Sequence, residues 1–366
     1  QTLLERSTER RRVGVRGPAG GVQRLLLVLD DLSMPPLDQY GSQKALCLLR
    51  QMIAYKFVFS ASQPGLRAEL EGLQYMAAMN PAYGVGSIPP RLGRLFCALA
   101  MAAPDADAIQ HIYGTVLAAH LAPFDSRVRQ AGEQLVAAVV GLHTAMASSF
   151  EPNAVRCHYV WDLRAPAALF GACVAFSTPE TCRDPLQLCA LFAHELRRVY
   201  CDRLVSAAEI ERFESLLERQ LRAQLTAVDA DAICAEPVTF IVHTKGSGVE
   251  QDGAGCGQRR YQPISGNELT RLLDSSLGAY NETHPLGQMD LVLFEHATSH
   301  LTRIARVLTI DQGHATLVGI AGSGRRSLTR LAAHIAGCEL WSPTSRASYS
   351  SADLLLELRD VFLRLG

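Results

Sequence analysis

The first apolar run of the chain ends in two carboxylates. The segment RLLLVLDD places five apolar residues, 25–29, directly before Asp30 and Asp31. Such a run predicts a buried central strand of a parallel sheet, and the carboxyl end of that strand is the edge at which open α/β sheets place ligands. The preceding residues 1–23 are basic and rich in glycine, which predicts a loop or a frayed helix end.

Helix and strand patterns then alternate before a long helical block begins. Apolar positions recur at helical spacing over 40–54, and the segment 73–79 predicts a second strand that ends at Asn80. Residues 107–149 also show helical periodicity, and further helical segments follow to about residue 225. The pattern therefore indicates an α/β sheet unit followed by an all-helical subdomain.

The remaining part of the chain predicts a second sheet unit. Residues 226–288 are less regular, and their glycine-rich stretch 246–258 predicts an exposed loop near a domain boundary. After them the pattern predicts an amphipathic helix at 291–308, a strand at 314–320 and a helix at 328–337. A glycine-rich turn joins this strand to the last helix, which is the order typical of a phosphate-binding site.

Composition and charge argue against several classes of partner. The 35 Lys and Arg residues nearly balance the 36 Asp and Glu residues, so the charge predicts neither a nucleic-acid partner nor a membrane surface. The longest apolar run is far shorter than the roughly 20 residues that span a bilayer.

The ten cysteines form no CxxC pair and many lie in apolar runs, which predicts reduced thiols and a cytoplasmic compartment. The stretch AHEL at 193–196 lacks the second histidine of a zinc motif, because Arg198 stands there.

The carboxylates after the first strand are candidates for nucleotide chemistry. Asp30 is expected to hold hydrated magnesium and Asp31 to orient an attacking water. An apolar strand that ends in Asp-Asp also occurs by chance in many α/β proteins, but Asn80 follows the second strand at the position of a sensor residue. Arg91 and Arg94 stand where an ATPase module would present an arginine finger to the phosphate of a neighbouring module. They also fit a solvated helix start.

The segment GIAGSGRRS has the spacing of a phosphate loop. Its glycines fit a turn whose backbone N–H groups, together with the N-terminus of the next helix, bind phosphate oxygens. Arg325 stands at the position of the usual lysine and Arg326 at that of the magnesium-binding Ser or Thr, while Ser327 lies one place late. This pattern favours nucleotide binding over efficient hydrolysis, with a ligand-free glycine turn as the alternative. The candidate binding residues are Gly319, Gly322, Ser323, Gly324, Arg325, Arg326 and Ser327.

The two candidate sites occur in reverse order. In a self-sufficient module the phosphate loop precedes the carboxylates, whereas no such loop precedes Asp30 and only about forty residues follow Gly324. The order therefore predicts a tandem array that has been cut across two modules, and Gln1 in the first position favours a segment of a longer chain.

Several segments of the chain resemble modules of one protein family. LVLDDLSMPPLDQYGSQKALCLLRQ resembles the Walker B region of the third AAA+ module of dynein heavy chains, and QYMAAMNP and PPRLGRLF resemble its sensor strand and arginine segment. HYVWDLR and AHELRRVYCDRLV resemble its helical lid. DLVLFEHATSHLTRIARVL and HATLVGIAGSGRRSLTRLAAHIAG look like the opening of the fourth module. The resemblance covers nearly all of the chain and is closest to axonemal, outer-arm-like heavy chains.

The resemblance implies a fold and a division into domains. It implies α/β AAA+ P-loop NTPase modules, each incomplete, with a parallel sheet flanked by helices and an all-helical lid. The implied boundaries are 1–115 for the back of the third module, 116–225 for its lid, 226–285 for an irregular connector and 286–366 for the front of the fourth module.

The resemblance also implies roles for individual residues. Asp30, Asp31 and Asn80 would serve the third module's nucleotide together with Arg164, the second sensor arginine. Arg91 or Arg94 would reach the second module's nucleotide. The loop 319–327 would hold ATP or ADP with Mg²⁺ in the fourth module, and the apolar residues 291–293 would lie near the base. Ser33 stands where these motors often have Asn, and Asp31 where other AAA+ proteins prefer Glu.

The parent protein implied by this resemblance is an ATP-driven microtubule motor of a cilium or flagellum. Its partners would be neighbouring modules of the same heavy chain, microtubules, and dynein intermediate and light chains. Both sites here would then be regulatory, since nucleotide occupancy shifts the populations of ring states. Two alternatives stay open: a non-motor tandem AAA+ remodelling ATPase, and a degenerate scaffold that no longer hydrolyses nucleotide.

Overall fold

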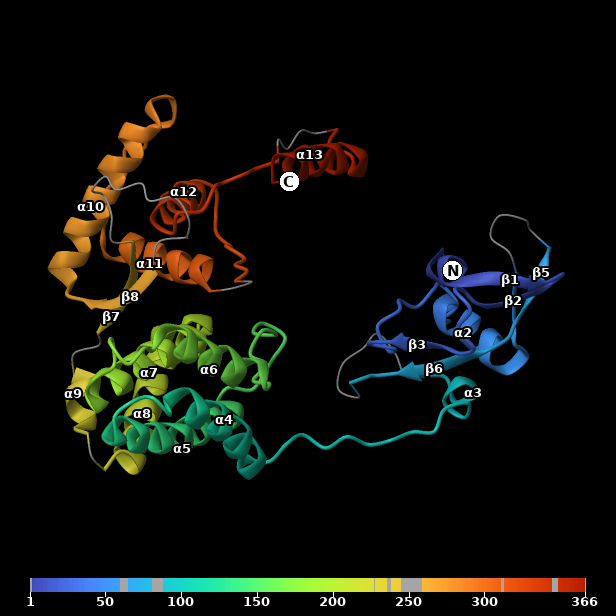
Figure 1. Ribbon diagram of the computed structural model, residues 1–366, viewed down its shortest axis with the longest axis horizontal. Helices are drawn as coiled ribbons and strands as arrows, with labels where there is room; N and C mark the ends of the chain where they lie inside the picture. Colours follow the sequence, from blue (N-terminus) through green and yellow to red (C-terminus); the bar gives the residue numbers. More distant parts are fainter. Residues whose placement is uncertain are drawn as a thin grey trace. The chain divides into compact units, whose positions relative to one another are not determined.

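The computed structural model describes two compact units, Gln1–Ala103 and Pro104–Gly366, and each is considered by itself (Figure 1). No helix among the described residues is long and apolar enough to cross a membrane. The described residues are 2–59, 65–80, 88–226, 228–235, 238–244, 259–310, 313–343 and 348–365.

The first unit contains the expected strand, helix and strand. β3 (Leu25–Leu29) pairs in parallel with β6 (Leu73–Ala77), with Leu29 opposite Ala77, and α2 (Lys44–Tyr55) follows β3 along the chain. α2 ends where Lys56 adopts a left-handed conformation with φ 55°. The prediction of a parallel pair with a connecting helix is therefore confirmed.

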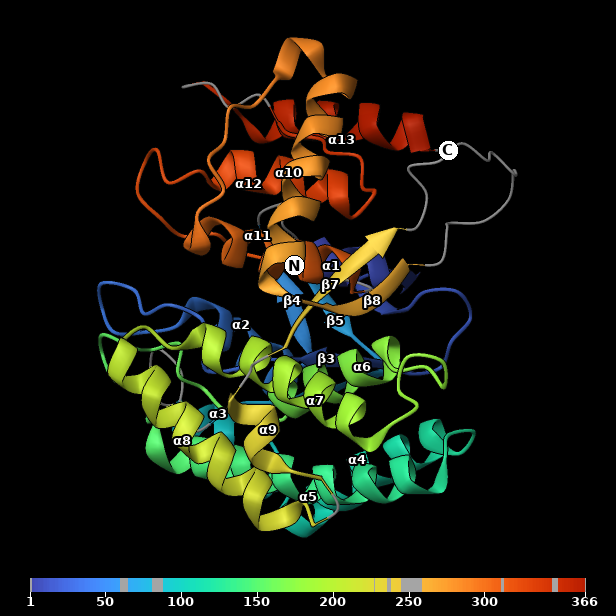
Figure 2. The same cartoon turned by 90° about the vertical axis from the view of Figure 1, so that its left-hand side faces the viewer.

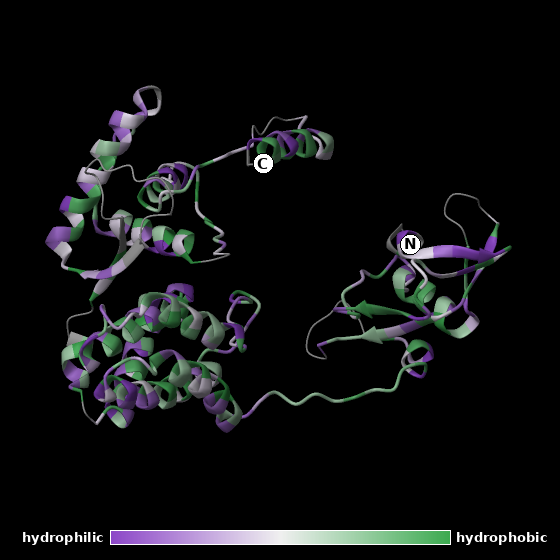
Figure 3. Cartoon of the chain, in the orientation of Figure 1, coloured by the Kyte–Doolittle hydropathy of each residue, from purple (hydrophilic) through white to green (hydrophobic). Residues whose placement is uncertain are grey.

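One face of this parallel pair is covered and the other is open. Leu27, Leu29 and Tyr75 pack against the core, which includes residues of α2. β3 is hydrophobic along its length (Figure 3), yet on the opposite face two of its apolar side chains are exposed, Leu26 by 49% and Val28 by 65%. We expected a strand buried on both faces, and this expectation was wrong for the described chain because covering elements lie on one face only.

The basic N-terminal segment forms regular structure rather than a loop. α1 (Thr2–Ser7) leads into β1 (Thr8–Arg12), which pairs in antiparallel fashion with β2 (Val15–Pro18). Gly14 has φ 74° and makes the turn between these strands. The second sheet has the order β1-β2-β5-β4 and also contains β4 (Phe57–Phe59) and β5 (Arg67–Leu70). The arginines of β1 point to solvent, and for this reason the strand has no apolar alternation that sequence analysis could detect.

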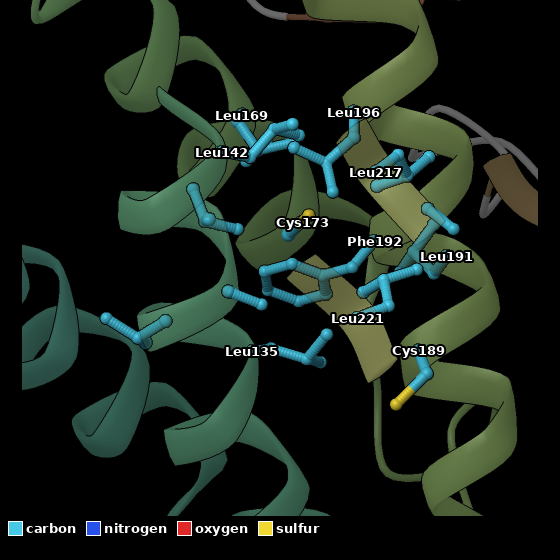
Figure 4. Packing of buried hydrophobic residues seen from close by; sticks show 14 of the residues in the cluster. Leu135, Leu142, Leu169, Cys173, Cys189, Leu191, Phe192, Leu196, Leu217 and Leu221 are labelled. Atoms are coloured by element: carbon cyan, nitrogen blue, oxygen red, sulfur yellow. The ribbon is translucent and has the colours of Figure 1, made fainter. Parts of the chain in front are cut away.

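The helical block predicted to about residue 225 is confirmed as a helical subdomain in the second unit. Four of its helices begin at polar caps, because the side chains of Asp105, Asp125, Asp184 and Ser206 accept from backbone N–H groups of the first turn. The fully buried ring of Phe192 lies among leucines from neighbouring helices (Figure 4). The elements are α4 (Ala106–Leu121), α5 (Ser126–Ser149), α6 (Arg164–Phe176), α7 (Pro185–Val199), η1 (Cys201–Arg203), α8 (Ala207–Gln224) and α9 (Ala230–Ala235).

The region predicted to be irregular contains two strands and a long helix. β7 (Thr239–Thr244) and β8 (Arg259–Ile264) pair in antiparallel fashion (Figure 2), and α10 (Gly266–Thr283) begins with a capping box at Ser265. The prediction of an irregular connector was therefore wrong. The predicted glycine-rich loop 246–258 lies outside the described residues.

The C-terminal part confirms two predicted helices but not the strand between them. After η2 (Pro285–Gly287) come α11 (Glu295–Thr309), α12 (Arg325–Ile335) and α13 (Ser351–Leu365). Residues 313–320 are described without strand structure, and Val318 is 92% exposed. The predicted strand at 314–320 is wrong here because a strand needs a hydrogen-bonded neighbour, and the described residues supply none for this segment.

Candidate functional site

The first candidate site lies at the carboxyl edge of the parallel pair. The pairing continues beyond the strands, because Ala78 donates its N–H to the carbonyl oxygen of Leu29 at 2.9 Å and accepts from Leu32 N–H at 3.0 Å. Asp30 and Asp31 therefore lie beside the end of β6, and Asn80 follows two residues after Ala78. The structure thus brings these three polar residues to one edge, as the sequence predicted, and all three are exposed.

Asp31 has an unusual backbone conformation. Its φ of 49° lies in the left-handed region, which costs roughly 1–2 kcal/mol for a residue with a side chain. Its carbonyl oxygen accepts from Met34 N–H at 2.9 Å, and the turn carries Ser33 into a buried position. Sequence reasoning missed this strain, which ends the strand directly at the candidate carboxylates.

Arg91 and Arg94 lie on and just after the short helix α3 (Pro90–Gly93). Leu92, which is 1% exposed, anchors α3 in the same core cluster as Leu32. Both arginine side chains are exposed. The helix thus holds two solvent-facing guanidinium groups on the core that also supports the turn after Asp31.

The lid motif HYVWDLR is a network of aromatic rings. Trp161 donates its indole N–H to the carbonyl oxygen of Phe150 at 2.8 Å and stacks on Tyr200 with ring centroids 5.6 Å apart. The hydroxyl of Tyr159 donates to Glu209 Oε2 at 2.9 Å. These bonds fix the chain directly before α6, and the guanidinium of Arg203 lies 4.8 Å from the Trp161 ring centroid.

Arg164 is the first residue of α6. Its backbone N–H donates to Asp162 Oδ1 at 3.1 Å, and its guanidinium pairs with the same carboxylate at 3.7 Å. The side chain is 94% exposed, so this ion pair contributes little to stability. Arg164 belongs to the second unit and Asp30 to the first, and the structure describes each within its own unit.

The segment 319–327 forms a compact turn at the start of α12, and we call it the phosphate loop. Gly322 and Gly324 have φ values of 83° and 73°, which favour glycine. A Cβ on Gly319 would come within 2.8 Å of Ser323 Oγ, so the turn is also too tight for a side chain there.

The phosphate loop fits an anionic group. α12 begins at Arg325, and the N–H groups of a first helical turn have no partner inside the helix. Together with the helix dipole they attract phosphate. Arg325 and Arg326 are exposed and Ser327 is half-buried, while Leu328 anchors the helix in the core. The start of α12 therefore offers backbone N–H donors together with the guanidinium groups of Arg325 and Arg326.

The apolar segment expected near the base lies against the same core. Leu291 and Leu293 are partly buried and pack on the cluster that contains Leu328, whereas Val292 is 82% exposed. The segment precedes α11 without regular structure.

Sequence reasoning missed one cluster of charges. Glu195, in the stretch that was tested for a zinc motif, is fully buried and accepts hydrogen bonds from Arg306 and Tyr261. A charged residue within an amphipathic helix normally points to solvent, so the sequence did not predict this burial. The apolar residues around the charged positions were its only sign in the sequence.

A parallel pair that ends in carboxylates, a helical lid and a glycine turn at a helix N-terminus define the class of AAA+ P-loop modules. Family models agree with this class. Residues 1–104 match a P-loop containing dynein motor region, 135–233 an AAA+ lid domain, and 289–366 a P-loop containing dynein motor region D4. Such P-loop regions bind nucleotides.

Curated proteins place the chain within one family. It is 34% identical over 369 residues to the ciliary dynein beta chain of Tripneustes gratilla and 33% identical over 367 residues to dynein axonemal heavy chain 17 of Homo sapiens. It is 32% identical over 371 residues to the flagellar outer arm dynein alpha chain of Chlamydomonas reinhardtii. Each match covers 100% of this chain and 8% of the relative. The chain therefore belongs to the dynein heavy chains, as a segment of their AAA+ motor region.

Proposed function

We propose that this chain forms parts of two adjacent nucleotide sites in the motor ring of a ciliary or flagellar dynein. The phosphate loop carries the proposal, because its left-handed glycines present the N-terminus of α12 and two arginines at one point. Similarity to dyneins whose names are ciliary, axonemal and flagellar supports the location in an axoneme.

The first site uses the sheet edge of the proposed third module. Asp30 holds Mg²⁺ through water, Asp31 orients the attacking water, and Asn80 senses the terminal phosphate. Arg164 reaches the same nucleotide from the lid, while Arg91 or Arg94 serves the second module. The proximity of the three residues at the edge supports the first three roles.

The second site lies in the proposed fourth module and binds ATP or ADP with Mg²⁺ at the phosphate loop. Arg325 keeps the positive charge of the usual lysine but presents a planar fork, which suits phosphate binding better than turnover. Arg326 removes the hydroxyl that normally binds magnesium. We propose that this site regulates the motor by its occupancy.

The proposed division of the chain follows these sites. We expected the back of the third module at 1–115, its lid at 116–225, a connector at 226–285 and the front of the fourth module at 286–366. Because a boundary at 115 would cut α4, we propose that the lid begins at Pro104 instead. Neighbouring modules of the same heavy chain would cover the open face of β3. Microtubules and dynein intermediate and light chains would be partners of the whole motor.

One observation favours the scaffold alternative. Arg325 and Arg326 replace both side chains that a hydrolytic phosphate loop uses, so a site that has lost its nucleotide remains a candidate. Photolabelling separates the two proposals, since a scaffold takes up no nucleotide at this loop.

The test uses a purified heavy chain that contains this segment and 8-azido-ATP. After illumination and proteolysis, we expect label on peptides from 289–340, which distinguishes this site from other sites of the ring. Arg325→Ala removes a charge-assisted hydrogen bond of about 1.5–3 kcal/mol and should weaken labelling roughly 10- to 100-fold.

Arg330→Ala is the matched control, because Arg330 is an exposed arginine on the same helix, beyond its first turn. We expect this variant to label like the wild type. Equal labelling of the two variants would contradict the role of Arg325, and the absence of label in the wild type would favour the scaffold.

A further inference from the structure

The β7–β8 pair lies between two hydrophobic cores of the second unit. Phe240 and Tyr261 belong to the core of the lid helices, whereas Ile241 belongs to the core formed with α10, α11 and α12. Neighbouring residues of a strand point to opposite faces, so β7 contributes to both cores at once. The pair therefore joins the lid to the helices that carry the phosphate loop (Figure 2).

One ion pair crosses this junction. Glu195 on α7 is 0% exposed, and Arg306 on α11 donates Nε to its Oε1 and Oε2 at 3.1 and 3.0 Å. Nη2 of Arg306 donates to Oε2 as well, which makes the contact bidentate. The hydroxyl of Tyr261 on β8 donates to Oε1 at 3.1 Å. Three elements of the chain thus meet at one carboxylate.

Burial makes this contact sensitive to geometry. A buried charge is tolerated only when its partners are well placed, and the loss of one partner leaves the other charge without compensation. Burial by itself lowers the pKa of Arg306, but the hydrogen bonds and charge of Glu195 raise it overall, so the guanidinium stays charged. A displacement of α11 relative to α7 would therefore break a directional contact.

A second charged group reinforces the junction. Asp202, just after α7, lies 3.3 Å from Arg198 Nη2 and 3.1 Å from Arg303 Nε on α11. Both contacts lie within ion-pair distance but lack hydrogen-bond geometry, so we assign them a smaller part than the Glu195 contact.

The junction connects the two proposed nucleotide elements. On one side Leu301 and Ala305 of α11 share a core with Leu331 of α12, whose N-terminus is the phosphate loop. On the other side α7 packs against α6, whose first residue is Arg164. A movement at the phosphate loop can pass through α12 and α11 to the ion pair and then to α7.

We propose that Glu195 and Arg306 are positioning residues that make the lid follow the occupancy of the phosphate loop. Nucleotide at the loop fixes α12 and α11, and the bidentate contact carries this restraint to α7 and the base of α6. This inference rests on the proposed nucleotide site and adds a route by which that site regulates its neighbour.

Amide hydrogen exchange on a heavy chain that contains this segment tests the proposal. In the wild type, ATP should slow exchange at the start of α12, in α11 and in α7. Because ATP of the third module also reaches the lid through Arg164, the part of each change that Arg325→Ala removes at the same ATP concentration is the part that comes from the phosphate loop. In the double variant Glu195→Met with Arg306→Met, both charges are removed and packing is kept, so the chain folds. We expect α12 and α11 to respond to ATP as before and this part of the α7 response to be lost.

A matched control comes from the same helix. Arg197 on α7 forms a bidentate pair with Glu214 on α8, both bonds 2.9 Å, within the lid. Glu214→Gln breaks that pair without touching the junction, so α7 should respond as in the wild type.

Each outcome decides between the two proposals. If this part of the α7 response persists in the double variant, or is equally lost in Glu214→Gln, the role of the ion pair is overturned. Absence of any response at α12 in the wild type overturns the nucleotide site itself, and the coupling with it.

Discussion

His194 connects the pH of the solution to the stability of the lid. Its ring is 7% exposed and packs against Phe240 and Tyr261. Burial, followed by the charges of Arg198 and Arg306, lowers the pKa of His194 to about 3. The unfolded chain binds this proton below the ordinary value of 6.5. The stabilisation that neutral His194 provides is therefore fully present above pH 6.5 and is lost as the pH falls toward 3.

The size of this effect follows from the two pKa values. Between pH 7 and pH 5 the unfolded state gains about 0.7 proton and the folded state almost none, and integrating this difference removes about 2 kcal/mol from the free energy of unfolding. The value depends mainly on the unfolded chain, because any folded pKa below about 4 leaves His194 neutral at pH 5.

His194→Gln isolates this contribution from other titrating groups. Glutamine does not titrate but can still donate to the backbone of Val238, as the histidine does. Urea unfolding of the unit Pro104–Gly366 at pH 7 and pH 5 can be followed through Trp161, with Trp341→Phe as the background. The wild type should lose about 2 kcal/mol more than the variant between these pH values. Equal losses would show that the ring is not buried in its neutral form.

Three further predictions concern packing and backbone conformation. Phe192→Ala should lower the free energy of unfolding by about 3–5 kcal/mol, because the ring is 0% exposed in the lid core; the same urea assay measures it. Gly171→Ala should raise that free energy by about 0.5–1 kcal/mol, since Gly171 lies in α6 and a Cβ there meets nothing within 4 Å. Gly324→Ala should greatly reduce 8-azido-ATP labelling, because φ is 73° there; labelling at the wild-type level would refute the conformation that we assign to the phosphate loop.

The sequence predicted elements whose signals are local. The apolar run before Asp30, the helical periodicity to about residue 225 and the glycine turn before α12 each depend on neighbouring residues, and the structure contains all three. The family resemblance followed from the same local segments and is confirmed by the matches to dynein motor regions.

The missed elements depend on contacts between distant residues. β1 and β2 carry arginines rather than an apolar alternation, so only their pairing shows that they are strands. The segment 314–320 has a strand-like sequence but lies without a hydrogen-bonded partner in the described chain, and a strand exists only with such a partner.

The sequence by itself determined where the candidate phosphate and magnesium residues lie, because spacing within a strand or turn fixes which groups share an edge. The tertiary structure alone decided that Glu195 and Arg306, 111 residues apart, meet in a buried pair. A charged residue on a helix carries no local sign of its partner, since burial and pairing are set by how the helices pack. The route between the two proposed sites is therefore visible only in the folded chain.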